Sequence, residues 1–216
     1  MVTQTDVKIV TATRAHAPFV AWVTMAAGRS HLPLGFYDFI AGGDEATTLR
    51  YCELLATTDA LHFAHYSTYF VAEVNGVPAA GMCGYFEESH GNIMAGFLEV
   101  EARLGRTPEE MQACLAKAGT IIHVMPEHVP GIWIVEHVAT KPEFRRQGLV
   151  ERLIGEVIDA GRQRGATTAD IGVLIGNDPA QRAYEKCGFE VIDEKRHPDF
   201  EAAYNCPGIR AMRRSI

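Results

Sequence analysis

The sequence predicts an α/β protein in which a central β-sheet is flanked by helices. In the second half of the chain, short apolar runs alternate with longer segments that have helical periodicity. In the first half, Asn75-Gly76 separates two apolar runs, which is the pattern of a β-hairpin. The 216 residues show no internal repeat, low-complexity tract or linker, so we expect a single domain over residues 1–216.

Each element follows from a local pattern. Short apolar or β-prone runs predict strands at residues 7–11, 69–74, 77–86, 132–139, 169–175 and 189–192. Apolar residues that recur on one helical face predict helices over residues 15–27, about 44–55, 108–118, 149–164 and 179–186. Within residues 87–131, the helix over 108–118 is the one element that we can assign.

Capping residues support several of these boundaries. Asp44-Glu45 and Pro108 suit helix N-termini, and Gly119 suits the end of the helix that Pro108 begins. Gly165 suits a left-handed cap after the helix over 149–164. Asp178 followed by proline predicts an N-cap and a first helical residue.

Composition narrows the class of protein. The formal net charge of −7 argues against nucleic acid as the main partner, because phosphate backbones are bound by clustered cations. The five cysteines are widely spread and form no Cys-x-x-Cys pair, so we expect a reducing compartment rather than disulfides or a zinc ribbon. We see neither a secretory signal nor an apolar run long enough to cross a bilayer. A cytoplasmic protein without a membrane partner is expected.

The stretch Arg145-Arg146-Gln147-Gly148-Leu149-Val150 lies between a predicted strand and a predicted helix. A glycine there lets backbone N–H groups approach an anion, and the helix directs its positive end toward it. The stretch therefore predicts a site for a ligand with clustered phosphates. A dinucleotide fold would need G-x-G-x-x-G, and a P-loop would need G-x-x-x-x-G-K-[ST]; neither occurs here.

This stretch resembles the acyl-CoA pyrophosphate loop of the GNAT superfamily of N-acetyltransferases, [RQ]-x-x-G-x-[GA]. The flanking order matches as well, with residues 138–144 before the loop and Asn177-Asp178-Pro179 through Tyr184-Glu185-Lys186-Cys187-Gly188-Phe189 after it. The resemblance is close over residues 132–192. It implies a mixed central sheet, with acetyl-CoA wedged between the strands led by Ile132 and Ala169.

The resemblance also implies which residues bind acetyl-CoA. These are Val138, Ala139, Thr140, Arg145, Arg146, Gln147, Gly148, Leu149, Val150, Asn177 and Tyr184. Val150 stands where the family has glycine or alanine, so its side chain must turn away from the pyrophosphate. Residues 87–131 form an insertion between the third and fourth strands, which either shapes the acceptor site or is a surface lobe.

Acyl transfer to an amine needs a base, because an alkyl amine has a pKa near 10.4 and is mostly protonated at neutral pH. Strand alternation places Glu136 on one face with Val138 and Thr140, and His137 on the other. The resemblance places the base just before the pantetheine-binding residues, where Glu136 stands. His137 is the second candidate, and a bulge in this strand would upset the ranking.

Tyr184 is the candidate acid for the departing thiolate, since tyrosine and thiol have comparable pKa values; the alternative is a core aromatic. Asn177 is expected to bind the pantetheine arm, the alternative being a turn former. His62-x-x-His65 offers too few ligands for a metal, and direct attack by the amine needs no covalent Cys187.

We therefore expect an N-acetyltransferase that moves acetyl from acetyl-CoA directly to a primary amine, on a small molecule or a protein. Two alternatives stay open: a non-catalytic acyl-CoA sensor, and an acyltransferase that uses an alcohol or a longer acyl group. The resemblance leaves a homodimer open, and the sequence does not identify the acceptor.

Overall fold

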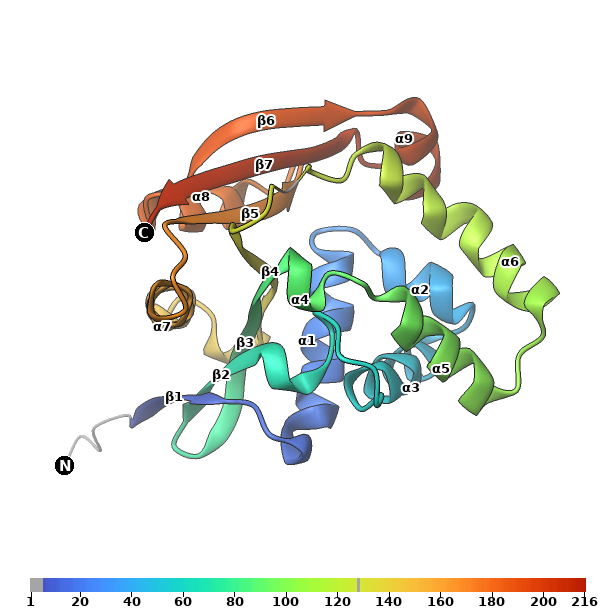
Figure 1. Ribbon diagram of the computed structural model, residues 1–216, viewed down its shortest axis with the longest axis horizontal. Helices are drawn as coiled ribbons and strands as arrows, with labels where there is room; N and C mark the ends of the chain where they lie inside the picture. The colour runs from blue at the N-terminus through green and yellow to red at the C-terminus, as the bar shows by residue number, and fades with distance from the viewer. Residues whose placement is uncertain (1–5, 128) are drawn as a thin grey trace.

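The computed structural model describes residues 6–127 and 129–216, and the strands in these residues form one seven-stranded sheet (Figure 1). The strands are β1 (Val7–Thr11), β2 (Tyr69–Val74), β3 (Val77–Phe86), β4 (Trp133–Thr140), β5 (Thr168–Leu174), β6 (Glu190–Arg196) and β7 (Gly208–Ser215). They lie in the order β1-β2-β3-β4-β5-β7-β6. Only β4 and β5 pair in parallel; the other pairs are antiparallel. The expected α/β class with a mixed sheet is confirmed.

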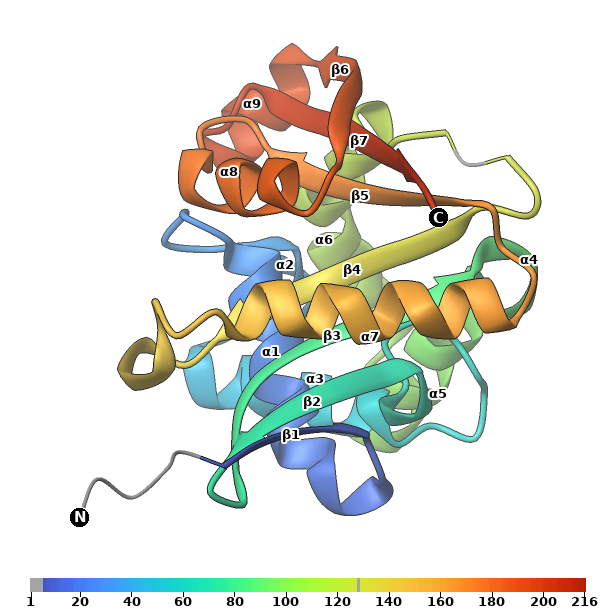
Figure 2. The same ribbon diagram turned by 90° about the vertical axis from the view of Figure 1, so that its left-hand side faces the viewer.

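Helices cover both faces of the sheet (Figures 1 and 2). On one face lie α7 (Leu149–Gln163) and α8 (Asp178–Lys186); on the other lies α1 (Ala17–Arg29). The remaining helices are α2 (Phe36–Ala41), α3 (Glu45–Ala56), α4 (Glu87–His90), α5 (Met94–Leu104), α6 (Pro108–Ala118) and α9 (Pro198–Tyr204). Short 3-10 turns are η1 (Arg14–His16), η2 (Tyr66–Thr68), η3 (Gly119–His123) and η4 (Pro142–Phe144). No described helix is long and apolar enough to cross a membrane.

The hairpin and most helix boundaries agree with the sequence prediction. Asn75 and Gly76 have φ values of 51° and 78°, as the predicted turn requires, and Gly165 has φ 91°. Two caps differ. The N-cap of α8 is Asn177, not Asp178, because the Asn177 side chain accepts the Ala180 N–H at 3.3 Å. Gly119 keeps a right-handed conformation, so the chain continues into η3 instead of ending there.

Trp133 joins α7 to the sheet. Its indole is 3% exposed, and it lies against two glycines, Gly84 in β3 and Gly161 in α7. A Cβ atom on Gly161 would stand 2.7 Å from the Trp133 ring. The close approach of helix and sheet at this point therefore requires the missing side chain.

His62 and His65 are structural rather than paired ligands. His62 is fully buried; its Nδ1 accepts the Ala64 N–H at 3.2 Å, and its Nε2 lies 2.9 Å from the Thr58 hydroxyl. Burial lowers the pKa of His62 to about 4. The His65 side chain caps η2.

Alanine substitutions at two glycines of α7 should change the free energy of unfolding in opposite directions. Gly161→Ala should lower the free energy of unfolding by about 1–3 kcal/mol, because it overpacks against Trp133. Gly155→Ala should raise it by about 0.5–1 kcal/mol, since no atom lies within 4 Å of its Cβ position and alanine favours the helix. Urea unfolding of both variants measures this. Equal effects at the two positions would contradict the packing described.

Buried His62 should make the fold sensitive to acid. Its pKa is lower in the folded state than in the unfolded chain, so the unfolded state takes up the proton first as pH falls below about 6.5. Between pH 7.5 and 5.0 this should remove about 2 kcal/mol of stability. Urea unfolding at both pH values should show a smaller difference for His62→Gln. The exposed His31→Gln control should keep the wild-type difference; a His62→Gln variant that also keeps it would refute the assignment.

Candidate active site

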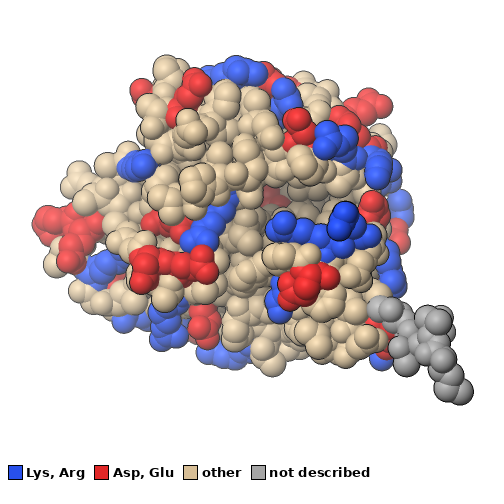
Figure 3. Space-filling model, turned by 180° about the vertical axis from the view of Figure 1, so that it is seen from behind, with Lys and Arg blue, Asp and Glu red and all other residues tan. Residues whose placement is uncertain are grey.

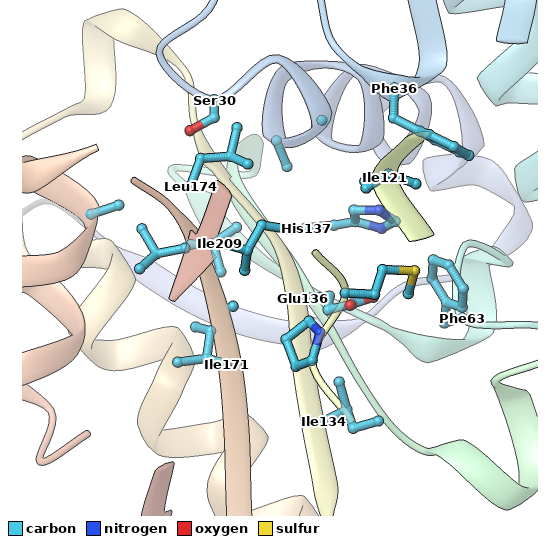
Figure 4. A pocket seen from close by; sticks show the side chains of 18 of the residues that line it. Ser30, Phe36, Phe63, Ile121, Ile134, Glu136, His137, Ile171, Leu174 and Ile209 are labelled. Atoms are coloured by element: carbon cyan, nitrogen blue, oxygen red, sulfur yellow. The ribbon is translucent and has the colours of Figure 1, made fainter. Parts of the chain in front are cut away.

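The sheet opens between β4 and β5. The two strands pair only where Trp133–Val135 meets Ala169–Ile171, and they separate beyond that point (Figure 2). A cavity of about 320 Å³ occupies the opening (Figure 4). Its described lining residues are Ala27, Gly28, Ser30, Phe36, Tyr37, Phe63, Gly91, Ile93, Ile121, Met125, Pro126, Ile134, Glu136, His137, Val138, Ile171, Gly172, Val173, Leu174, Asn177, Ala180, Tyr184 and Ile209.

A bulge interrupts β4 at the cavity. Cys83 of β3 pairs with Glu136, and Gly81 pairs with Ala139, so one residue of β3 faces two residues of β4. His137, within the bulge, has φ 53°. The expected alternation of faces is therefore wrong here: Glu136 and His137 both line the cavity, because the extra residue turns His137 toward it.

Two tyrosine hydroxyls hold the His137 ring. Tyr37 Oη lies 2.9 Å from Nε2, and Tyr69 Oη lies 2.6 Å from Nδ1. A neutral imidazole donates at one nitrogen and accepts at the other, which this arrangement satisfies. Burial lowers the pKa of His137 to about 3. His137 is therefore neutral near pH 7 with both nitrogens engaged, which suits positioning of the bulge and does not suit proton uptake.

Glu136 is the carboxylate in the cavity wall. The Tyr85 hydroxyl donates to its Oε2 at 3.0 Å. Tyr85 is 4% exposed and stacks on Phe63, with ring centroids 5.4 Å apart. Burial, with the nearby Glu136 charge, raises the pKa of Tyr85, so this hydroxyl keeps its proton and fixes the orientation of the carboxylate.

Tyr184 and Asn177 approach the cavity from α8. Tyr184 is 6% exposed, and burial raises the pKa of its hydroxyl, which therefore carries a proton at neutral pH. The Asn177 amide makes two hydrogen bonds: its oxygen caps α8, and its Nδ2 donates to the Ser30 hydroxyl at 2.6 Å. This bond connects the end of β5 to the connection between α1 and α2.

The cationic loop lies where β4 leads into α7. Arg146 and Gly148 have φ values of 61° and 72°, and Gly148 is the N-cap of α7. The first N–H groups of a helix have no partner within it, so this turn offers donors to an anion. Arg145 and Arg146 are exposed. Val150 is half-buried and packs against the apolar core, so its side chain does not occupy the loop surface. Figure 3 shows a hollow on this side of the molecule, with Lys and Arg side chains beside it.

Several residues that shape the cavity were not predicted. Tyr37 and Tyr85 come from elements far away in the sequence, and their hydroxyl contacts have no local signal. The segment over residues 87–131 also contributes, through Gly91, Ile93, Ile121, Met125 and Pro126. The segment therefore forms part of the cavity wall.

Comparison with known proteins agrees with this geometry. The family model described as "Acetyltransferase (GNAT) family" matches residues 39–189. A Bacillus subtilis protein, provisionally named a ribosomal protein bS18 alanine N-acetyltransferase, is 35% identical over 66 residues. That match covers 28% of this chain and 44% of the relative, so it spans under half of the relative's length.

Solved structures share the fold. An N-acetyltransferase from Staphylococcus aureus superposes with a TM-score of 0.68 at 17% identity, covering 96% of this chain and 100% of that one. A Salmonella typhimurium protein solved with its cofactor acetyl-CoA superposes with a TM-score of 0.53 at 16% identity, covering 97% and 93%. The family match covers most of the chain, and the chain belongs to the acetyltransferase (GNAT) family, acyltransferases that use acetyl-CoA.

Proposed function

We propose that this protein transfers an acetyl group from acetyl-CoA directly to a primary amine while both are bound, with Glu136 as general base and Tyr184 as general acid. The observation that carries the proposal is the cavity between β4 and β5. One carboxylate from β4 and one protonated phenol from α8 line the same opening. The amine nitrogen forms a bond to the acetyl carbon, the carbon–sulfur bond breaks, and coenzyme A leaves as a thiol. The ammonium gives up two protons in all: the first passes to Glu136 and then to solvent, and the second, lost from nitrogen after attack, restores the Tyr184 phenol that protonated the thiolate.

The loop over residues 145–150 would bind the diphosphate of acetyl-CoA. Exposed Arg145 and Arg146 supply positive charge, and the N–H groups of Gln147, Gly148, Leu149 and Val150 surround the N-terminus of α7. Burial of the Val150 side chain keeps the main chain of the loop accessible to the phosphates.

The pantetheine arm would run along β4 beyond the bulge. Val138, Ala139 and Thr140 lie past the last residue of β4 that pairs with β5. Their main-chain groups on that side are suited to the amides of the arm, as in strand pairing. Asn177 lies opposite, in the cavity wall.

The proton transfers follow from the two side chains. An alkyl ammonium must lose a proton before it attacks, and Glu136, oriented by Tyr85, is placed to receive it. Attack puts negative charge on the carbonyl oxygen, which a main-chain N–H of the β4 bulge would stabilise. The thiolate that leaves takes the Tyr184 proton; burial raises the pKa of this hydroxyl, so it is protonated when the thiolate forms.

Removing either proton carrier should stop turnover without preventing donor binding. Glu136→Gln and Tyr184→Phe should each lower kcat by about 10²–10⁴-fold, while the Kd for acetyl-CoA stays within a few fold of wild type. Thiol release and calorimetry give the two readouts. Glu156→Gln, an exposed change on α7, is the control. If both variants turn over normally, these roles are wrong; if the wild type releases no thiol with any amine, the protein is a binding module.

Charge reversal in the loop should weaken binding of the phosphate-bearing part of coenzyme A and of no other part. The double change Arg145→Glu, Arg146→Glu should weaken coenzyme A binding by about 100-fold, because repulsion replaces attraction at the diphosphate. Binding of pantetheine, which carries no phosphate, should not change. Arg50→Glu on α3 is the matched surface control. Unchanged coenzyme A affinity in the double variant would place the diphosphate elsewhere.

A further inference from the structure

The end of the cavity nearest Glu136 has a largely aromatic and aliphatic wall. Phe36, Phe63 and Ile121 lie around His137 (Figure 4). The Phe63 and His137 ring centroids are 5.5 Å apart, and the Phe36 and Tyr37 rings are nearly perpendicular with centroids 5.2 Å apart. Such a wall gains free energy from an apolar ligand and offers few hydrogen bonds to a polar one.

The described part of the wall contains one acidic side chain. Among the described lining residues, Glu136 is the single acid, and none is lysine or arginine. Burial lowers the pKa of His137 to about 3, so this ring, which is hydrogen-bonded to Tyr37 and Tyr69, adds no positive charge near pH 7. A second ammonium on the acceptor would therefore lack a described carboxylate partner, and an acceptor carboxylate would lack a cation. Burying an unpaired charge is costly.

A packed cluster adjoins the cavity. Leu32, Val124, Phe200 and Tyr204 are buried together, joining the α1–α2 connection, the residue after η3, and α9. The Tyr204 hydroxyl donates to the Ala118 carbonyl at 3.0 Å.

The inner side of this cluster is also cavity wall, through Phe36, Ile121, Leu174 and Ile209. A polypeptide acceptor that continued past its amino group in this direction would have to break the cluster open.

We propose that the acceptor is a small primary monoamine with an apolar body, aromatic or branched aliphatic, which the cavity encloses. This inference rests on the proposed acetyl transfer and specifies its substrate class. It excludes polyamines, free amino acids and the N-terminus of a protein as preferred acceptors.

Matched pairs of amines test the class. With the full chain and saturating acetyl-CoA, thiol release is measured for 2-phenylethylamine against phenylalanine, which adds a carboxylate. It is also measured for 3-methylbutylamine against 1,5-diaminopentane, which adds a second ammonium. In each pair the monoamine should have the higher kcat/KM, by at least about 100-fold. A peptide that begins with alanine should react no better than phenylalanine.

The outcomes separate this inference from the proposed function. If phenylalanine, the diamine or the peptide reacts as well as its apolar counterpart, the substrate class is wrong and acetyl transfer stands. If acetyl-CoA binds and no amine releases thiol, the transfer itself is refuted and the class with it.

Two adjacent isoleucines provide a control within the chain. Ile121 lines the cavity, and Ile122 is 72% exposed. Ile121→Ala should lower kcat/KM for 2-phenylethylamine by about tenfold and leave the KM for acetyl-CoA unchanged, whereas Ile122→Ala should change neither. Thermal unfolding of both variants checks the fold. Equal kinetics in the two variants would show that the acceptor does not contact this wall.

Discussion

The opening of the sheet between β4 and β5 is the constraint on which the rest of the site depends. Pairing stops after Val135 and Ile171, and β4 then takes in an extra residue at His137. A histidine with φ 53° is a strained conformation that needs support. The hydroxyls of Tyr37 and Tyr69 supply that support from α2 and β2. Burial lowers the pKa of His137 to about 3, so the ring is neutral near pH 7, and in the proposed reaction Glu136 is the proton acceptor.

The two sides of the opening differ in chemistry, and this difference assigns one side to the donor and the other to the acceptor in the proposed reaction. The side toward α7 ends in Arg145, Arg146 and a helix N-terminus, which suit a diphosphate. The side toward η3 and α9 is apolar, with Glu136 as its described acid. In the proposed reaction, a donor and an acceptor that enter these two sides would meet at the bulge, where the new bond would form.

The sequence predicted the region from residue 132 to 192 well, because its signals are local. Gly165 occupies the left-handed position expected for a cap, and Gly148, also left-handed, stands at the expected junction of loop and helix. Elements that depend on distant partners were missed. In α5, Glu101 lies inward and breaks the apolar pattern; it is 6% exposed and paired with Arg106 and Tyr51.

The last strand and the bulge were missed for the same reason. β7 carries charged residues that a buried strand rarely has, but Arg213 pairs with Asp170 of β5 across the sheet. The bulge has no local signature at all, since the strand sequence reads as regular alternation. The candidate residues Glu136 and Tyr184 could be named from the sequence, whereas the environment that distinguishes Glu136 from His137 could not.

Amide hydrogen exchange with and without acetyl-CoA tests most directly whether the donor occupies the opening between β4 and β5. The account predicts slower exchange, on adding acetyl-CoA, in two separate segments: residues 138–140 of β4, and residues 146–151 at the start of α7. Protection confined to other elements, with no change in these two segments, would contradict it.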